Sequence, residues 1–153
     1  PVIMLDGGHN PECAAALENV LVRFAGDKSI TVLIGMMADK DTKDYLAAIL
    51  PHCKTAVFTK PSNPRAEDEN VLLREGKCFC RDVVSVKDPK DAYKKARSLV
   101  KNGDMLLVWF VLPAFRHFRR ALKNLTYLCS FDTIFIRVIL KFNGRVFYLR
   151  YDL

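Results

Sequence analysis

Short apolar runs alternate with helical patterns along the first 108 residues of the chain. The runs are unbroken, and an unbroken run of this length is typical of a strand that is covered on both faces. Strands of this kind occur mainly in parallel sheets, so the pattern predicts a parallel sheet. The predicted strands are Val2–Leu5, Ile30–Ile34, Ala56–Thr59, a segment around Cys78–Cys80, Val83–Val86 and Met105–Val108.

Helical segments lie between these runs. Asn10-Pro11-Glu12 and Asp88-Pro89 each place a capping side chain directly before a proline, which suits a first helical turn. The predicted helices run from Pro11 to Gly26, from about Thr42 to Pro51, from about Ala66 to Glu75 before Gly76, and from Pro89 to Asn102-Gly103. The side chains expected to face the core are Ala14, Leu17, Leu21, Phe24, Tyr45, Leu46, Ile49, Leu50, Ala92, Tyr93, Ala96, Leu99 and Val100.

The alternation of strand and helix predicts βαβ units. The expected fold class is therefore α/β, a Rossmann-like, mostly parallel, doubly wound sheet with helices on both faces. After Val108 the pattern changes: residues 119–125 could form a helix, and residues 134–142 and 145–151 around Asn143-Gly144 predict a β-hairpin with a type I′ turn. We expect an α/β domain over residues 1–125. Residues 126–153 would form an atypical basic tail, either a hairpin or poorly ordered.

The net charge of +7 is unevenly distributed. Residues 1–108 hold 16 Lys or Arg against 15 Asp or Glu, whereas residues 109–153 hold 8 against 2. The excess therefore belongs to residues 109–153, the last part of the chain. A basic tail can attract phosphate or a membrane surface, and a solvated end has the same composition. We expect a monomer with neither nucleic acid nor membrane as a partner.

Cysteine usage and hydropathy set the expected compartment. The five cysteines fit no disulfide framework, and Cys78 and Cys80 are too close in sequence for a zinc pair. We therefore expect a reducing, cytoplasmic setting. The sequence contains no run of 18 apolar residues, so we do not expect a membrane span. The chain opens inside an apolar run at Pro1 without an initiator Met, so we expect it to be part of a longer polypeptide.

In a doubly wound sheet, ligands bind at the carboxyl ends of the strands. The first such loop, residues 6–11, offers the carboxylate of Asp6, two glycines, the imidazole of His9 and a helix N-terminus at Asn10, which favours an anion. Asp6 could accept a hydrogen bond from a ribose hydroxyl or lie in the outer shell of a metal, and His9 could donate to a phosphate. Alternatively, Asp6 and His9 only hydrogen-bond the turn and cap the helix.

Two further loops carry charge. Asp39-Lys40-Asp41 could hold a charged substrate or could simply cap a helix. Arg65, in a loop stiffened by prolines, is a candidate contact for a carboxylate or phosphate. Residues 26–29, Gly-Asp-Lys-Ser, lack the upstream glycine and strand of a Walker motif, so the chain has no cradle of its own for a γ-phosphate. No catalytic triad or metal-ligand spacing is present in the sequence.

Three motifs follow one another in order: Asp6-Gly7-Gly8-His9-Asn10-Pro11, Gly35-Met36-Met37-Ala38-Asp39-Lys40-Asp41 and Asn63-Pro64-Arg65-Ala66. In this combination the sequence resembles the C-terminal domain of folylpolyglutamate synthase / dihydrofolate synthase, in the wider Mur ligase family, over residues 1 to about 108.

The resemblance implies an ATP-dependent amide ligase of folate biosynthesis and one-carbon metabolism. In that family ATP phosphorylates the carboxylate of folate or dihydropteroate, and the amine of L-glutamate attacks the acyl phosphate. The central domain carries the phosphate loop and the Mg²⁺ ligands, and the C-terminal domain closes over it to exclude water. By this resemblance Asp6 contacts ATP, and His9 and Asn10 match the same motif.

One segment departs from the family pattern. After the last strand the family usually has a Gly-Ser-x-Tyr-Leu loop near the amino-acid substrate, whereas this chain has Trp109 to Phe115. Codons for Trp-Phe-Val-Leu-Pro, read one base later, can encode Gly-Ser-Phe-Tyr-Leu, and residues 119–123 again look like the family's closing helix. We hypothesise a local frameshift between about Trp109 and Phe118. The nucleotide sequence tests it, because the idea fails if the shifted frame does not spell that loop.

Three interpretations stay open at this point. The chain is a folate-ligase fragment that is inactive alone, a stand-alone nucleotide-binding or interaction module with a basic tail, or a degenerate fragment without activity. Deleting the tail distinguishes the second, because a real polyanion site would lose its salt-dependent binding.

Overall fold

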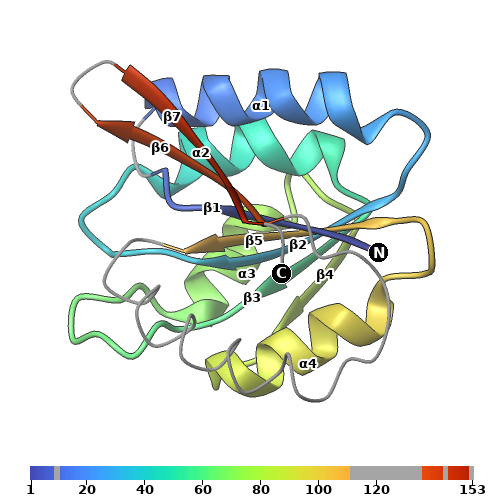
Figure 1. Ribbon diagram of the computed structural model, residues 1–153. Coiled ribbons are helices and arrows are strands. Elements are labelled where there is room, and N and C mark those ends of the chain that lie inside the picture. The colour runs from blue at the N-terminus through green and yellow to red at the C-terminus, as the bar shows by residue number, and fades with distance from the viewer. Residues whose placement is uncertain (9–10, 111–135, 143–144, 152–153) are drawn as a thin grey trace.

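The computed structural model describes residues 1–8, 11–110, 136–142 and 145–151. In this part of the chain, seven strands form one sheet in the order β4-β3-β2-β5-β1-β6-β7 (Figure 1). The strands are β1 (Val2–Asp6), β2 (Ile30–Gly35), β3 (Thr55–Phe58), β4 (Asp82–Ser85), β5 (Met105–Phe110), β6 (Ile136–Phe142) and β7 (Arg145–Tyr151). The helices are α1 (Pro11–Ala25), α2 (Thr42–Ile49), the 3₁₀ helix η1 (Leu50–His52), α3 (Glu69–Gly76) and α4 (Pro89–Leu99).

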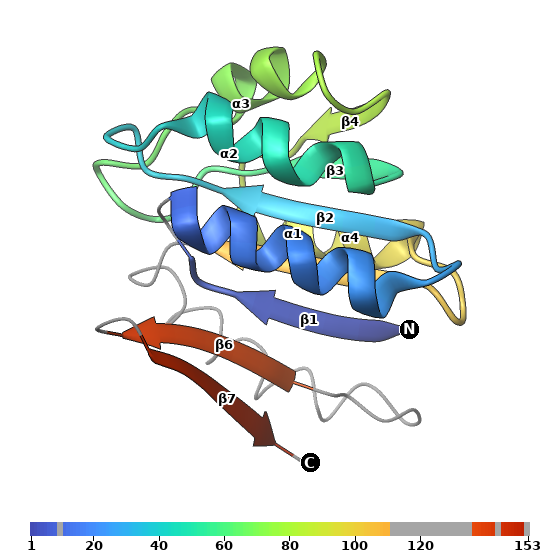
Figure 2. The same cartoon turned by 90° about the horizontal axis from the view of Figure 1, so that it is seen from above.

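Strands β1 to β5 are parallel to one another, as predicted. The chain steps in one direction from β1 to β2, β3 and β4, and then returns to β5 between β2 and β1. Connections between parallel strands are right-handed, so the face on which the connecting helix lies depends on whether the next strand is added to the left or to the right of the previous one. Helices α1, α2 and α3 accordingly cover one face of the sheet and α4 covers the other (Figures 1 and 2).

The two faces of the sheet bury two sets of side chains. On the first face Met4 and Leu107 pack with Leu46 of α2, and on the second face Leu5 and Val108 pack with Ala92, Tyr93 and Ala96 of α4. Successive residues of a strand point to opposite faces. Asp6 and Trp109 therefore share the face of Met4 and Leu107, which α1 and α2 cover. The predicted fold class, α/β with helices on both faces of a mostly parallel sheet, is confirmed.

Several element boundaries differ from the sequence-based expectation. β5 continues to Phe110, two residues beyond the predicted end. α3 begins at Glu69 rather than near Ala66, because Ala66 forms a β-bridge with Met37 and the carboxylate of Asp68 caps the helix by accepting from the amide of Asn70. Leu99, predicted to face the core, is 38% exposed at the end of α4.

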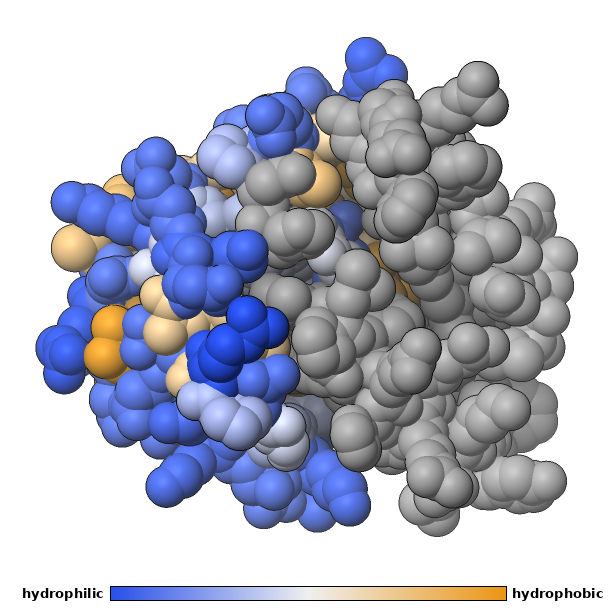
Figure 3. Space-filling model, turned by 90° about the vertical axis from the view of Figure 1, so that its left-hand side faces the viewer, coloured by the Kyte–Doolittle hydropathy of each residue, from blue (hydrophilic) through white to orange (hydrophobic). Residues whose placement is uncertain are grey.

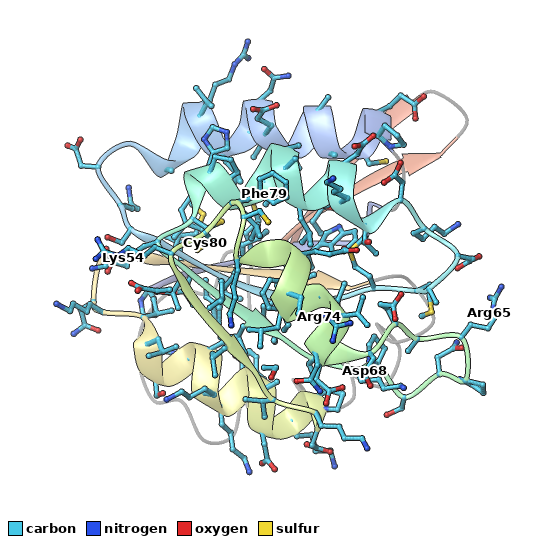
Figure 4. All side chains as sticks on the ribbon, turned by 180° about the vertical axis from the view of Figure 1, so that it is seen from behind. Lys54, Arg65, Asp68, Arg74, Phe79 and Cys80 are labelled. Carbon is cyan, nitrogen blue, oxygen red and sulfur yellow. The ribbon has the colours of Figure 1, made fainter. Side chains whose placement is uncertain are left out.

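The predicted strand at Cys78–Cys80 is wrong. The amides of this segment donate to the carbonyls of Glu75 and Gly76, which makes it a turn continuing from α3. The thiol of Cys80 is buried against the backbone carbonyl oxygens of Cys53, at 3.5 Å, and Lys54, at 3.6 Å (Figure 4). Backbone groups satisfied by a preceding helix cannot also pair with a neighbouring strand.

The hairpin is present at the edge of the sheet. β6 and β7 pair antiparallel, and Phe142 lies opposite Arg145, so two residues connect them as predicted. β6 also runs parallel to β1, with Asp6 opposite Ile139. The turn type at residues 143–144 and the helix at 119–125 lie outside the described residues. No described helix is long and apolar enough to cross a membrane.

Candidate functional site

The carboxyl ends of the parallel strands lie at one edge of the sheet, at the left of Figure 1. The loops that follow β1, β2 and β3 all leave from this edge. Figure 3 looks straight at it and shows mainly hydrophilic side chains over its described part. The edge therefore brings together the loops that the sequence singled out.

The first loop begins with a turn directly after β1. The amide of Gly8 donates a hydrogen bond of 2.7 Å to Oδ1 of Asp6. A Cβ atom at Gly8 would lie 2.6 Å from Cβ of Cys13 and 2.9 Å from Oδ1 of Asp6, so glycine is required here for steric reasons. One oxygen of Asp6 therefore stabilises the turn, as the alternative interpretation of this residue expected. His9 and Asn10 lie outside the described residues.

The carboxyl group of Asp6 is almost fully buried, with 4% of the residue exposed. Burial raises its pKa from 3.8 to about 6, while the hydrogen bond from the Gly8 amide and the nearby indole of Trp109 act in the opposite direction. At neutral pH the group is mainly ionised, yet it takes up a proton only slightly below neutrality. A carboxyl group perturbed in this way marks a candidate functional site.

Two aromatic residues that sequence reasoning did not assign to the site adjoin Asp6. Trp109 is opposite Asp6 on β5 and is fully buried. Its ring stacks on Tyr45 of α2, with centroids 4.0 Å apart and planes at 25°. Both Nε1 of Trp109 and the hydroxyl of Tyr45 are buried without a hydrogen-bond partner among the described residues. Two features of the sequence could have pointed to these residues. Tyr45 was predicted to face the core, and the apolar run of β5 continues beyond Val108 to Trp109 and Phe110.

The second and third loops are joined to each other. The amide of Ala38 donates to the carbonyl of Arg65 at 2.9 Å, and Met37 pairs with Ala66. This pairing brings the guanidinium of Arg65 to 3.8 Å from the carboxylate of Asp39, which also lies 3.9 Å from Nζ of Lys40. The Arg65 side chain is 71% exposed and extends away from the body of the domain (Figure 4).

The charged cluster is therefore Asp39, Lys40 and Arg65, and Asp41 has a different role. Oδ1 of Asp41 accepts from the amide of Asp44 and caps α2. The helix-capping interpretation of this loop holds for Asp41, while the other three side chains remain available to solvent. His52, in η1, is partly buried and lies 3.1 Å from a carboxylate oxygen of Glu18.

Within the described ranges, no group of three or more His, Cys, Asp or Glu side chains converges as metal ligands would. Three features lie at this edge: the buried carboxyl of Asp6 at the end of β1, the turn at Gly8, and the mixed-charge cluster on the loops after β2 and β3. Such features are typical of the ligand-binding edge of a doubly wound α/β domain.

Comparison with known families agrees with an α/β domain of this kind. The family "Mur ligase, glutamate ligase domain" matches residues 1–109, and the chain belongs to it. The match ends at Trp109.

The relatives include ligases with two kinds of substrate. The chain is 33% identical to a dihydrofolate synthase/folylpolyglutamate synthase of Mycobacterium tuberculosis, over 67% of this chain and 22% of the relative. It is 30% identical to a UDP-N-acetylmuramyl-tripeptide synthetase of Leifsonia xyli, over 70% of this chain and 22% of the relative. The chain thus spans about a fifth of the length of these proteins.

Solved structures share the fold. The structure of E. coli FolC in complex with DHPP and ADP superposes with a TM-score of 0.69 at 21% identity, covering 76% of this chain and 27% of that one. The M. tuberculosis folylpolyglutamate synthase complexed with ADP superposes with a TM-score of 0.67 at 25% identity, covering 76% and 28%.

Proposed function

We propose that this chain is the C-terminal domain of an ATP-dependent ligase that joins L-glutamate to folate or dihydropteroate in the cytoplasm. The domain would contribute to ATP and glutamate binding when it closes over the rest of the enzyme, and it would be inactive alone. The observation that carries this proposal is the buried carboxyl of Asp6 at the turn into α1. The similarity to a dihydrofolate synthase/folylpolyglutamate synthase supports the substrate class.

The Asp6 turn suits the sugar and phosphate parts of a nucleotide. An ionised carboxylate only accepts hydrogen bonds, so Asp6 would bind a hydroxyl of the ribose or a water molecule around Mg²⁺. The N-terminus of α1 favours negative charge, so the phosphates would lie beside Asp6 on the helix side, with His9 and Asn10 as neighbours. The close contact of Gly8 with Cys13 keeps this turn short.

The cluster of Asp39, Lys40 and Arg65 suits an amino acid that carries both signs of charge. Arg65 and Lys40 would bind the carboxylates of glutamate, and Asp39 would bind the ammonium group. Asp39 holds Arg65 in place without covering it, since the Arg65 side chain stays largely exposed. The cluster would therefore position glutamate rather than perform a chemical step.

Catalysis requires parts that lie beyond this chain. The chain spans 22% of its M. tuberculosis relative. The described residues do not form a metal site, so Mg²⁺ would be held mainly by the remainder of the enzyme. Domain closure would exclude water from the acyl phosphate, and the C-terminal loops would add orientation and charge stabilisation.

An NMR titration of the full chain with ATP tests the nucleotide part. We expect the amide signals of Asp6, Gly8 and the first turn of α1 to shift at millimolar ATP, and the Asp6→Asn variant to bind more weakly. Asp27→Asn, the same change at an exposed turn after α1, is the matched control. Shifts elsewhere, or equal binding by both variants, would contradict the proposal.

A chimera tests the substrate class. This chain would replace the C-terminal region of the M. tuberculosis dihydrofolate synthase/folylpolyglutamate synthase, and ligation of glutamate to dihydropteroate and to folate would be measured. We expect activity with at least one of them, reduced in Arg65→Gln. A folded chimera that binds ATP and ligates glutamate to neither substrate would contradict the assignment to a folate ligase.

A further inference from the structure

The indole N–H of Trp109 is buried, and among the described residues it has no partner that meets strict hydrogen-bond geometry. Trp109 nevertheless lies opposite Asp6 on the neighbouring strand, and a hydrogen bond from its side chain lowers the pKa of Asp6. The N–H is therefore close to the Asp6 carboxyl without meeting that geometry. A buried donor that lacks a partner is unfavourable, so its retention needs an explanation.

The orientation of the indole is fixed from the other side. Tyr45 of α2 stacks on Trp109 with ring centroids 4.0 Å apart, and both side chains are buried. The stack leaves the indole little freedom to turn towards another acceptor. The only described carboxylate to which Trp109 is coupled is therefore that of Asp6.

We propose that Trp109, held by its stack on Tyr45, is a positioning residue for Asp6: its N–H donates to the carboxylate when Asp6 is ionised, and this hydrogen bond weakens when Asp6 is protonated. Oδ1 of Asp6 is held by the amide of Gly8, so the indole would orient the rest of the carboxylate. As a contribution to nucleotide binding, this role rests on the proposed function. As a contact between Trp109 and Asp6, it can be tested without any ligand.

Few other titratable groups of the described chain face Asp6. α2 contributes Tyr45, whose pKa is raised far above its usual range by burial and by Asp6, so it stays neutral throughout. α1 contributes Cys13, next to the turn. The β6 residue opposite Asp6 is Ile139, which carries no charge. His9, outside the described residues, is three positions along the chain and needs its own control.

Trp109 is the single tryptophan of the chain, so tryptophan emission excited beyond the tyrosine absorption band reports on the surroundings of this ring. We expect the emission of the full chain to change in one step with a midpoint near pH 6, where Asp6 takes up its proton. Asp6→Asn should abolish the step, whereas Asp27→Asn and His9→Gln should retain it. Far-UV circular dichroism at both ends of the titration confirms that the fold is intact.

The converse measurement follows the carboxyl carbon of Asp6 by NMR. In Trp109→Phe the midpoint should rise by about one pH unit, the size expected for one lost hydrogen bond to a charged group. If that variant does not fold, the indole N–H proton of the wild type must titrate with the same midpoint as the Asp6 carboxyl. Tyr45→Phe keeps the stacked ring and should retain the fluorescence step.

A step that persists in Asp6→Asn, a step lost in His9→Gln, or an indole proton that does not follow the carboxyl would each overturn the proposal. The failure of the proposed function looks different: ATP would then leave the Asp6 turn unaffected, while the fluorescence step and its loss in Asp6→Asn would still support the Trp109 contact.

Discussion

Replacing Asp6 by Asn should stabilise the folded domain at neutral pH. The pKa of Asp6 is raised from 3.8 to about 6 in the folded state, so the folded state binds this proton more tightly than the unfolded state does. A group of this kind contributes stability that is fully present below pH 3.8 and is lost as the pH rises through about 6. The wild type should therefore lose stability over this window, and Asp6→Asn should not.

The size of the effect follows from the shift. A difference of about 2.2 pH units corresponds to about 3 kcal/mol of unfolding free energy. Because Asp6 is only 4% exposed, solvent screening does not reduce this figure greatly. The Asn side chain can still accept from the amide of Gly8 through its carbonyl oxygen, so the turn should remain.

Urea unfolding measured by circular dichroism between pH 4 and pH 7.5 tests this expectation. The quantity of interest is the difference in unfolding free energy between Asp6→Asn and the wild type, which should grow by about 2 kcal/mol across that range, because pH 4 already lies just above the unfolded pKa of 3.8. Asp27→Asn at an exposed turn should keep the wild-type pH dependence. A difference that stays constant with pH, or one that shrinks as the pH rises, would refute the assignment of a buried, proton-binding carboxyl.

Three other substitutions test the packing and capping around the site. Gly8→Ala should lower the unfolding free energy by about 1–3 kcal/mol, because the new methyl would overlap Cβ of Cys13, and ATP binding should weaken with it. Gly76→Ala should destabilise by about 1–3 kcal/mol or more in urea unfolding, because its methyl would overlap the ring of Phe58, and an unchanged midpoint would contradict this. Asp88→Ala should lower stability by about 1 kcal/mol, because the amides of the first turn of α4 lose their cap; a loss equal to that of an exposed Lys90→Ala control would argue against the cap.

Capping chemistry was readable from the sequence because it is local. Asp88 before Pro89 predicts the start of α4, and its carboxylate does accept from two amides of the first turn. Gly26 was predicted to end α1, and it adopts a positive φ of 52° directly after that helix. These features depend on neighbours within a few residues, so no knowledge of the tertiary structure was needed.

At Gly76 the local sequence pattern did not show why glycine is needed. The sequence placed it as a stop at the end of a helix, and α3 does end there. Its φ is not positive, however, and the position excludes a side chain because the ring of Phe58, from the strand beneath, fills the space. A contact between residues 18 positions apart has no signature in the local pattern.

The candidate site likewise has one part that the sequence predicted and one part that depended on tertiary contacts. The motifs identified the loops of Asp6, Asp39 and Arg65, and the rule that parallel strands end at one edge predicted that these loops share a side of the molecule. The sequence did not show that Arg65 reaches Asp39, because that contact depends on backbone pairing between two loops.

The sequence by itself determined the alternation of helices with parallel strands over most of the chain, the cap of α4 and the family, because periodicity and cap chemistry act over a few residues. Only the tertiary structure decided that Trp109 and Tyr45 adjoin Asp6 and that burial raises the pKa of its carboxyl to about 6. The physical reason is that burial and strand register depend on which segments distant in sequence pack together, and the charge of a carboxyl responds to all of them.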